Sequence, residues 1–406
     1  MMENKQTSGP RRMDPFGEGY VDPNKEKLEA LSLETIGLPV RCLLHSETVQ
    51  VLTWQYKLLK GRGGDAREGL GVYRFSGRAR VQGQDVPWSM ILKIIRPSRD
   101  EPSSYAGKRE VLAYRSGFLD DLPGGLAAPQ CLGINEWPDG EFWMWIEEVV
   151  DQVGDEWPIE RFGLAARHLG QLNGTYLAGK PLPNQDWFSR KWLRQYTAQY
   201  GKAMTQLNTN LKHPLMRRVC PPDVAAQLER LWPKREPWLD LIEHLPQTFC
   251  HMDAFVRNLF ARRSSDGHEE TVAIDWPYAG IGAVGEELAP LVSMGLGRQR
   301  ISLDDLHMLD RVVFKGYLEG LNDAGWNGDP DLARFGFVAS APLRYGFMST
   351  RFVEFFNTLD KDRQTELERR MEAEWAQNEH FFAQFQHFLF SLADEATKLV
   401  KTVSSH

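Results

Sequence analysis

One polar loop and the strand end that follows it constrain this chain more than any other part of its sequence. The loop reads His251-Met252-Asp253-Ala254-Phe255-Val256-Arg257-Asn258, and after a short gap Asp275 ends an apolar strand in Ile274-Asp275-Trp276. Phosphoryl transfer from a nucleotide requires one carboxylate to accept the proton of the attacking hydroxyl and two oxygen ligands to hold Mg²⁺ against the phosphates. The two acids and the amide supply this set. Together they indicate phosphoryl-transfer chemistry, although any one of them would mean little.

Length and charge are compatible with this chemistry and argue against one class of partner. The chain has 406 residues, enough for two lobes that each bury a core, and its 42% apolar and 25% charged content is typical of a globular protein. The net charge of -7 argues against nonspecific nucleic-acid binding, which relies on an excess of lysine and arginine. We therefore expect no nucleic-acid partner.

The cysteines and the N-terminus favour a cytoplasmic protein. The cysteines are scattered and form no C-x-x-C pair, so we expect reduced thiols, although the spacing leaves a bridge open: Cys42, Cys131, Cys220 and Cys250. No apolar run approaches the ~20 residues that span a bilayer, and the polar N-terminus is unlike a signal peptide. We expect no membrane partner and a loose tail over residues 1–24. The sequence leaves the oligomeric state open.

The front of the chain has the pattern of a small antiparallel sheet. The predicted strands are Val49–Leu59, Gly69–Val81, Val86–Ile95, Cys131–Trp137 and Glu141–Val149. A segment with helical spacing, Ser103–Leu119, precedes the last two strands, and Gly83-Gln84-Asp85 is the predicted turn between the second and third. Residues 25–148 should therefore form an N-terminal β lobe.

The remainder, residues 149–406, is mostly helical. The predicted helices are Ile159–Leu177, Trp187–Leu207, Asp223–His244, Gly285–Met294, Leu303–Asn322, Asp331–Leu359 and Asp362–Leu399. A strand pair, Leu259–Arg263 and Thr271–Asp275, interrupts them. The predicted class is α+β, with a small antiparallel β lobe that contains one helix and a larger, mainly helical lobe.

Four further segments follow the order of one known family. Gly71–Gly77 is similar to the second strand of that family, Lys93 in Met90-Ile91-Leu92-Lys93-Ile94-Ile95 stands at its third-strand lysine, and Glu110 lies on the next helix. Gly282–Ala289 is similar to its Gly-x-Asp-Leu-Ala segment, with Glu287 in place of Asp. The chain thus resembles the aminoglycoside phosphotransferase and choline-kinase-like family, a branch of the protein-kinase fold that phosphorylates small molecules. The resemblance covers roughly residues 39–291.

The resemblance implies a two-lobed, protein-kinase-like fold and a role for each motif residue. Asp253 would orient the acceptor hydroxyl and take its proton, while Asn258 and Asp275 would hold Mg²⁺. Lys93 would bind phosphate oxygens and pair with Glu110, since a buried ammonium without a partner is costly. His251 would brace the loop by hydrogen bonding.

The remaining nucleotide contacts would come from backbone. Gly63 and Gly64, in the glycine-rich segment Gly61–Gly69, are the predicted cover for the phosphates, although such a turn often binds nothing. Glu147 and Glu148 end the fifth strand, where the family offers main-chain groups to adenine. The expected cofactors are ATP and Mg²⁺.

The sequence disfavours three other interpretations. The sequence Gly280-Ile281-Gly282-Ala283-Val284-Gly285 matches G-x-G-x-x-G, but the alternating strands and helices of a dinucleotide-binding fold are missing. A protein kinase is disfavoured because Trp276-Pro277 replaces Phe-Gly and no Ala-Pro-Glu follows. A catalytically silent kinase-fold protein that binds a nucleotide or ligand is the main alternative, which the presence of the complete motif set disfavours.

The resemblance implies that the acceptor is a small molecule with a hydroxyl group, similar to an aminoglycoside, amino alcohol or sugar. Acidic residues that would suit a polyamine or a choline-like cation are Glu286, Glu287, Asp304, Asp305, Glu319 and Glu354. Aromatic residues that would add cation–π contacts are Trp326, Tyr345, Phe352 and Phe355. Arg344 and Arg351 would equally suit an acidic or phosphorylated substrate. In an alternative interpretation that needs no ligand, the charged residues simply form solvent-exposed helix faces and the aromatic residues form the packed core.

Overall fold

The contacts of the chain divide it into two units. The computed structural model describes residues 22–59, 71–96, 105, 107–154, 156–264, 266–294, 303–351 and 359–405, without the side chains of 215, 216, 219, 294, 303, 366–368 and 370–383. Unit 1 lies within Met1–Val111 and Pro129–Glu148, and unit 2 within Leu112–Ala128 and Val149–His406. The lobe limits 25–148 and 149–406 stay a prediction. The predicted tail falls largely outside the described residues.

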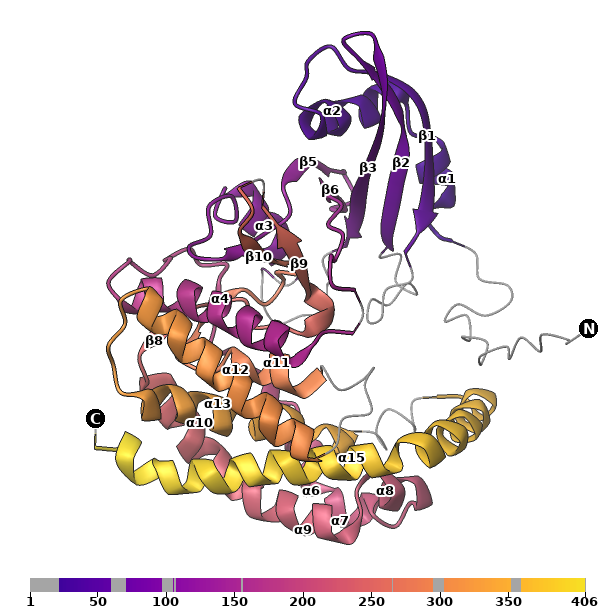
Figure 1. Ribbon diagram of the computed structural model, residues 1–406. Helices are drawn as coiled ribbons and strands as arrows, with labels where there is room; N and C mark the ends of the chain where they lie inside the picture. The colour runs from indigo at the N-terminus through magenta and orange to yellow at the C-terminus, as the bar shows by residue number, and fades with distance from the viewer. Residues whose placement is uncertain are drawn as a thin grey trace, which may run out of the picture. The chain divides into compact units, whose positions relative to one another are not determined.

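Unit 1 is built on a five-stranded antiparallel sheet (Figure 1). Its strands are β1 (Gln50–Leu58), β2 (Gly71–Val81), β3 (Gln84–Ile95), β5 (Cys131–Glu136) and β6 (Phe142–Glu147), in the spatial order β1-β2-β3-β6-β5. The five predicted strands are confirmed, but the predicted turn at Gly83-Gln84-Asp85 is shifted. Gln82 and Gly83 both have positive φ, as a two-residue hairpin loop requires, so β3 already begins at Gln84.

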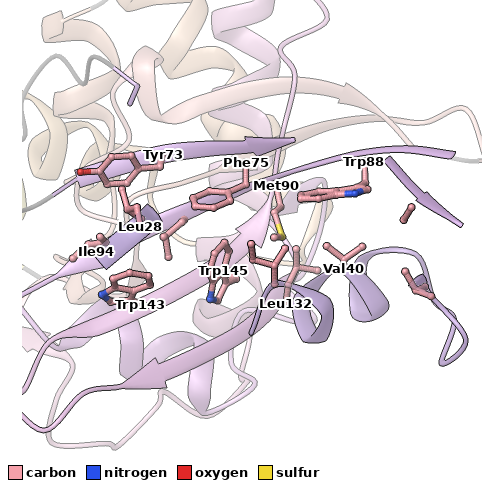
Figure 2. Close-up of a cluster of buried hydrophobic side chains, with 14 residues drawn as sticks. Leu28, Val40, Tyr73, Phe75, Trp88, Met90, Ile94, Leu132, Trp143 and Trp145 are labelled. Carbon is pink, nitrogen blue, oxygen red and sulfur yellow. The ribbon is translucent and has the colours of Figure 1, made fainter. Parts of the chain in front are cut away.

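Two helices that the sequence interpretation missed cover one face of this sheet. They are α1 (Lys25–Glu29) and α2 (Leu33–Leu43). Figure 2 shows Leu28 of α1 and Val40 of α2 among the buried side chains of the strands, where Trp145 packs edge-on against Phe75 with ring centroids 5.0 Å apart. Because alternate strand residues point to opposite faces, Lys93, between buried Leu92 and Ile94, points to the other face.

Helices make up most of unit 2. They are α4 (Ile159–Leu177), α5 (Trp192–Ala198), α6 (Gly201–Thr205), α7 (Leu207–Asn210), α8 (Pro214–Val219), α9 (Pro222–Leu231), α10 (Arg235–His244), α11 (Leu288–Met294), α12 (Leu303–Asp323), α13 (Pro330–Tyr345) and α15 (Lys361–Val403). One more helix, α3 (Arg109–Arg115), begins in unit 1 and ends in unit 2. Within the described part of the chain, no helix is both long and apolar enough to cross a membrane.

The helices α4 and α12 lie side by side at close range (Figure 1). A Cβ atom added to Gly170 would lie 2.3 Å from the carbonyl oxygen of Tyr317, and one added to Gly320 would lie 2.0 Å from that of Arg167. Real Cβ atoms do not come this close, so glycine is what lets the two backbones approach. This closely packed pair supplies Asn173 and Tyr317, which lie beneath the motif residues of unit 2.

Two three-stranded sheets in unit 2 carry the motif loops. β7 (Ser189–Arg190), β11 (Gly280–Ala283) and β8 (Gln247–Cys250) form one sheet, and β4 (Leu126–Ala127), β10 (Glu269–Ala273) and β9 (Leu259–Arg263) form the other. Residues 251–258, which we call the motif loop, join β8 to β9, and residues 274–279 join β10 to β11. Both loops therefore run between the same two sheets. The predicted α+β class, an antiparallel β unit and a mainly helical unit, is confirmed.

The predicted helix Trp187–Leu207 is wrong in its extent. Ser189 instead pairs with Gly280 in a short parallel ladder, which uses backbone groups that a helix would need. Lys191 then takes a left-handed φ of 53°, so α5 begins only at Trp192. Tertiary pairing has overridden a helical pattern of apolar residues here.

Three more predicted helices differ from the structure. Asp223–His244 is divided by a 3₁₀ turn that contains Pro233, which has no amide hydrogen to continue a helix. Asp331–Leu359 ends as an α-helix at Tyr345. Ser103–Leu119 is shortened to α3, with residues 97–104 and 106 outside the described part.

The G-x-G-x-x-G sequence serves packing and does not open a dinucleotide-binding unit. Its first four residues form β11, which runs antiparallel to β8. Gly285 has a φ of 85°, and a Cβ atom there would lie 1.9 Å from the carbonyl oxygen of Ala333. The glycine is therefore required both for its backbone conformation and for the close approach of α13.

We predict that Gly285→Ala destabilises the protein by about 2–4 kcal/mol. The left-handed conformation costs about 1–2 kcal/mol for a residue with a Cβ atom, and relieving the overlap with Ala333 costs about as much again. Gly267→Ala is the matched control, because Gly267 has a φ of 88° with no atom within 4 Å of an added Cβ. Urea unfolding of both variants measures the difference, and equal losses would show that the close approach is unimportant.

Candidate active site

A buried ion pair joins β3 to α3 in unit 1. Lys93 Nζ lies 2.8 Å from both carboxylate oxygens of Glu110, and the two side chains are 13% and 7% exposed. A bidentate, largely desolvated pair of this kind holds the ammonium group in one position. The structure thus brings together the lysine and the glutamate that the sequence paired.

The acidic side chains at the end of β6 form contacts with other residues of unit 1. Glu147 Oε2 accepts a hydrogen bond from Gln130 N at 3.2 Å, and Glu148 binds Arg74 Nε at 2.7 Å. These carboxylates are therefore already engaged with protein groups. Gly63 and Gly64, the predicted phosphate-covering residues, lie outside the described part of the chain.

His251 ties the motif loop of unit 2 to the end of β10. Its ring is fully buried, its Nε2 lies 2.9 Å from the carbonyl oxygen of Ile274, and its Nδ1 accepts a hydrogen bond from Asp253 N at 3.1 Å. These contacts require a neutral ring with the proton on Nε2. The prediction that His251 braces the loop is confirmed.

Asp253 and Asn258 contact each other directly in this loop. Asn258 Nδ2 donates to Asp253 Oδ2 at 3.0 Å and to the Asp253 carbonyl oxygen at 2.9 Å. This geometry directs Asn258 Oδ1 away from Asp253, and that oxygen accepts no hydrogen bond from the described residues. Ile274 N, in the residue before Asp275, donates to the Asn258 carbonyl oxygen at 2.9 Å, so Asp275 lies next to this pair. The structure therefore gathers the three motif residues in one place.

Two residues of these loops are held in a conformation that is uncommon for their type. Met252 has a φ of 65° and Asp275 a φ of 62°, both in the left-handed region. Each such residue costs about 1–2 kcal/mol and persists only where surrounding contacts enforce it. One of these residues adjoins Asp253, and the other is the predicted second metal ligand.

Arg344, at the end of α13, binds Asp253 from the other side. Its Nη2 lies 3.0 Å from Asp253 Oδ1, and its Nη1 donates to the Met252 carbonyl oxygen at 2.6 Å. Burial raises the pKa of Asp253 above its ordinary value, while the charges of Arg344 and Arg257 oppose this shift. The sequence had suggested Arg344 only as a contact for an acidic substrate.

Glu287 holds the backbone of the motif loop from below. It is fully buried and accepts hydrogen bonds from His251 N, from Met252 N at 3.3 Å and from Asn173 Nδ2 at 2.9 Å. Glu287, which stands where the family has an aspartate, therefore supports the backbone of this loop. Burial raises the pKa of Glu287 to about 7, against the opposite effect of these hydrogen bonds.

The partners of Glu287 were missed by the sequence interpretation. Asn173 of α4 also donates to the Phe249 carbonyl oxygen at 2.8 Å, and Tyr317 of α12 donates to Asn173 Oδ1 at 2.7 Å. The one available signal was a polar residue on the apolar face of a predicted helix, between Leu169, Leu172 and Tyr176. Such a position indicates a buried hydrogen-bond network but does not reveal its partners.

The residues present fit a magnesium ion that is shared with a substrate. In the described part of the chain, no group of three His, Cys, Asp or Glu side chains could hold a metal. Mg²⁺ does not need such a group, since it is usually held by one or two protein oxygens together with phosphates and water. Asn258 Oδ1, which accepts no hydrogen bond from the described residues, and the neighbouring carboxylate of Asp275 are groups of this kind.

The sequence matches the model of one protein family. Residues 74–320 match the model described as the phosphotransferase enzyme family, and this span contains Lys93, Glu110, Asp253, Asn258 and Asp275. The comparison with curated proteins gave no match.

Solved structures of several kinases are similar to this chain at low identity. An amicoumacin kinase in complex with AMP-PNP and Ca²⁺ is 14% identical, covers 90% of this chain and 96% of its own, and has a TM-score of 0.49. Choline kinase from Cryptosporidium parvum is 12% identical, covers 85% of this chain and 89% of its own, and has a TM-score of 0.49. An aminoglycoside 2'-phosphotransferase in complex with GDP is 15% identical, covers 86% of this chain and 100% of its own, and has a TM-score of 0.42. Values this low transfer no substrate to this chain.

We predict that Glu287→Gln removes part of the pH dependence of stability. A carboxyl group with a pKa of about 7 when folded and about 4.5 when unfolded stabilises the protein most below pH 4.5, and this contribution is lost as the pH rises through 7. Between pH 5.5 and pH 8, the wild type should lose about 2 kcal/mol relative to the Glu287→Gln variant. Urea unfolding at both pH values tests this, and parallel pH profiles would contradict it.

Proposed function

This chain belongs to the phosphotransferase enzyme family, and from that premise we propose that it transfers the γ-phosphate of ATP, with Mg²⁺, to a hydroxyl group of a small molecule. The observation that carries the proposal is the contact between Asp253 and Asn258 beside Asp275. A proton acceptor and two oxygen ligands for a metal are what this transfer requires from the protein.

Asp253 is proposed as the residue that orients the acceptor and takes its proton. An ionised carboxylate offers about four acceptor positions, and the two bonds from Asn258 and Arg344 leave room for a hydroxyl group. The acceptor oxygen would form a bond to the γ-phosphorus, the bond to the bridging oxygen would break with its electrons going to ADP, and the hydroxyl proton would pass to Asp253. The bonds to Asn258 and Arg344 support this role because they fix the carboxylate before substrate arrives.

Asn258 and Asp275 are proposed as the ligands of Mg²⁺. When bound, the ion would neutralise the negative charge of the phosphate oxygens. Asn258 would contribute its Oδ1, since its Nδ2 is occupied by Asp253. The left-handed φ of Asp275 supports the assignment, because such strain is concentrated at binding sites.

Lys93 is proposed to bind phosphate oxygens, with Glu110 holding its ammonium group in place. The bidentate contact with Glu110 supports this role, because it fixes the ammonium group in one position. Backbone contacts at Glu147 and Glu148, and a phosphate-covering loop at Gly63 and Gly64, stay predictions from the family resemblance. Action in the cytoplasm, without a nucleic-acid or membrane partner, is likewise an expectation.

We predict that Asp253→Asn lowers acceptor-dependent turnover by at least about 100-fold, because general base catalysis typically contributes 10²–10⁴-fold. The dissociation constant of ATP should change little, since Asp253 is not proposed to touch the nucleotide. The measurement is Mg²⁺-dependent nucleotide consumption with a panel of aminoglycosides, choline and sugars. Asp266→Asn, at an exposed turn between β9 and β10, is the control.

The outcomes of this experiment separate the two function classes. Turnover that is lost only in the Asp253→Asn variant would support a phosphotransferase. ATP binding by the wild type without turnover of any acceptor would favour the silent nucleotide-binding protein. A wild type that binds no nucleotide at all would contradict both.

We also predict that Lys93→Met weakens ATP binding by about 10- to 100-fold. A hydrogen bond to a charged partner contributes about 1.5–3 kcal/mol, which corresponds to this range. Lys25→Met is the control, because Lys25 lies exposed on α1 and pairs only weakly with Glu29 at 3.8 Å. Isothermal titration of the folded variants with ATP and Mg²⁺ measures the effect, and equal affinities for both variants would contradict the assignment.

A further inference from the structure

The motif loop itself contains an exposed arginine that forms no ion pair with the described residues. Arg257 immediately precedes Asn258 and is exposed. Its guanidinium group lies 4.1 Å from the ring centroid of Phe255, and it has no ion pair or hydrogen bond with any described residue. The centroid of the same Phe255 ring lies 5.4 Å from the guanidinium carbon of Arg344, which pairs with Asp253. Arg257 thus lies in the neighbourhood of that carboxylate. The loop therefore holds an exposed cation beside the proposed catalytic carboxylate.

Arg344 adds to the positive charge at the same place. Because it already forms an ion pair with Asp253, the negative charge of Asp253 is largely balanced inside the protein. Arg257 is then an additional positive charge on this side of the loop. A cationic acceptor that approaches Asp253 would be repelled by it, whereas an anionic group would be attracted.

Aromatic rings surround Arg344 and reach the surface. The guanidinium carbon of Arg344 lies 4.3 Å from the ring centroid of Trp192, 5.2 Å from that of Tyr345 and 5.4 Å from that of Phe255. Trp192 in turn packs edge-on against Tyr278, which is 40% exposed. Flat apolar faces next to a charged group are typical of sites that bind rings of small ligands.

Tyr345 contributes a buried polar atom that has no partner among the described residues. Its residue is 4% exposed, and its hydroxyl group forms no hydrogen bond there. A buried hydroxyl without a partner costs about 1–3 kcal/mol, so a ligand or a water molecule is needed to satisfy it. Its ring lies beside Arg344, and its phenol is electrostatically coupled to Asp253, so this orphan belongs to the same region.

Glu286 and Glu287, two of the acidic residues that would attract a polyamine, are already engaged with backbone groups. Glu286 is buried and accepts a hydrogen bond from Ala283 N at 3.0 Å, while Glu287 is consumed by the loop backbone. Glu319 lies on α12, where it pairs with Lys315. Glu286 and Glu287 thus serve structure. Glu319 forms only a weak exposed pair at 3.8 Å, and Glu354 lies outside the described residues.

We propose that the acceptor carries an anionic group, a carboxylate or a phosphate, near its reacting hydroxyl, and that Arg257 binds this group. The inference rests on the proposed function, since it names the class of molecule that Asp253 activates. Arg257 acts as a specificity-determining residue. An arginine suits this task because its planar donors match carboxylate and phosphate oxygens in pairs.

A matched series of sugars tests the proposal, because its members share one ring and differ mainly in charge. The series is glucose, glucosamine, glucuronate and glucose 6-phosphate, and the last two separate a carboxylate from a phosphate. Binding to the ATP-loaded wild-type protein is measured by ligand-observed NMR, and phosphorylation by nucleotide consumption. The variants are Arg257→Gln and Arg257→Glu. The control is Arg263→Gln, since Arg263 is exposed on β9 and pairs with Glu269 at only 3.9 Å.

We expect the wild type and the Arg263→Gln variant to bind at least one anionic sugar about 10-fold or more tightly than glucose, and glucosamine no better than glucose. The Arg257→Gln variant should lose most of that preference, and the Arg257→Glu variant should reverse it in favour of glucosamine. A merely structural role of Arg257 would weaken all four sugars alike and would not reverse their order. Raising the salt concentration should reduce the preference, because the site is exposed.

Two results would overturn the inference: a wild type that prefers glucosamine or is indifferent to charge, and a charge preference that survives in the Arg257→Glu variant. Failure of the proposed function is distinguishable from either. In that case, the wild type would show the Arg257-dependent anion preference but consume no nucleotide with any acceptor. Turnover with a preference for cations would instead preserve the proposed function and remove the anion site.

Discussion

The carboxylate of Glu287 is the constraint on which the geometry of the motif loop depends. It accepts the backbone N–H groups of His251 and Met252, which the left-handed turn at Met252 places in the buried interior. A buried N–H group without a partner costs about 1–3 kcal/mol, so the loop could not hold this conformation without an acceptor. Because Asn173 of α4 donates to Glu287 and Tyr317 of α12 donates to Asn173, the loop is fixed to both helices. The glycines that let these helices approach therefore also help to position Asp253.

The charges around Asp253 are balanced in an asymmetric way. On one side, Arg344 pairs with it in a largely buried contact, and removal of one partner from such a pair commonly costs about 3–5 kcal/mol. On the other side, Asn258 donates one neutral hydrogen bond and leaves its amide oxygen without a donor from the described residues. A carboxylate held by an arginine and an amide keeps its orientation without losing all of its acceptor capacity. Arg257, exposed beside it, extends the positive charge toward an incoming ligand.

Local patterns were sufficient for the parts of the fold in which neighbours along the chain determine the structure. The strands of unit 1 alternate buried and exposed residues, as Tyr73, Arg74 and Phe75 do, and hairpins join β2 to β3 and β5 to β6. The helix α4 was predicted with its observed limits, Ile159–Leu177, because its apolar face is continuous. The helix α2 was missed even though Ser32 caps it through Thr35 N at 3.1 Å. Short strands such as β7 and β11 could not be predicted either, because their pairing partners lie far away in the sequence.

The sequence by itself determined which chemical groups are available and in what order, and this was enough to identify Asp253, Asn258, Asp275 and Lys93 as residues to examine. Each of these residues belongs to a short motif, so it can be recognised from its neighbours along the chain. Only the tertiary structure decided what holds these groups. Arg344 reaches Asp253 across 91 residues, and Asn173 reaches Glu287 across 114. Contacts between such distant residues are set by the packing of whole helices, which periodicity along the chain does not encode.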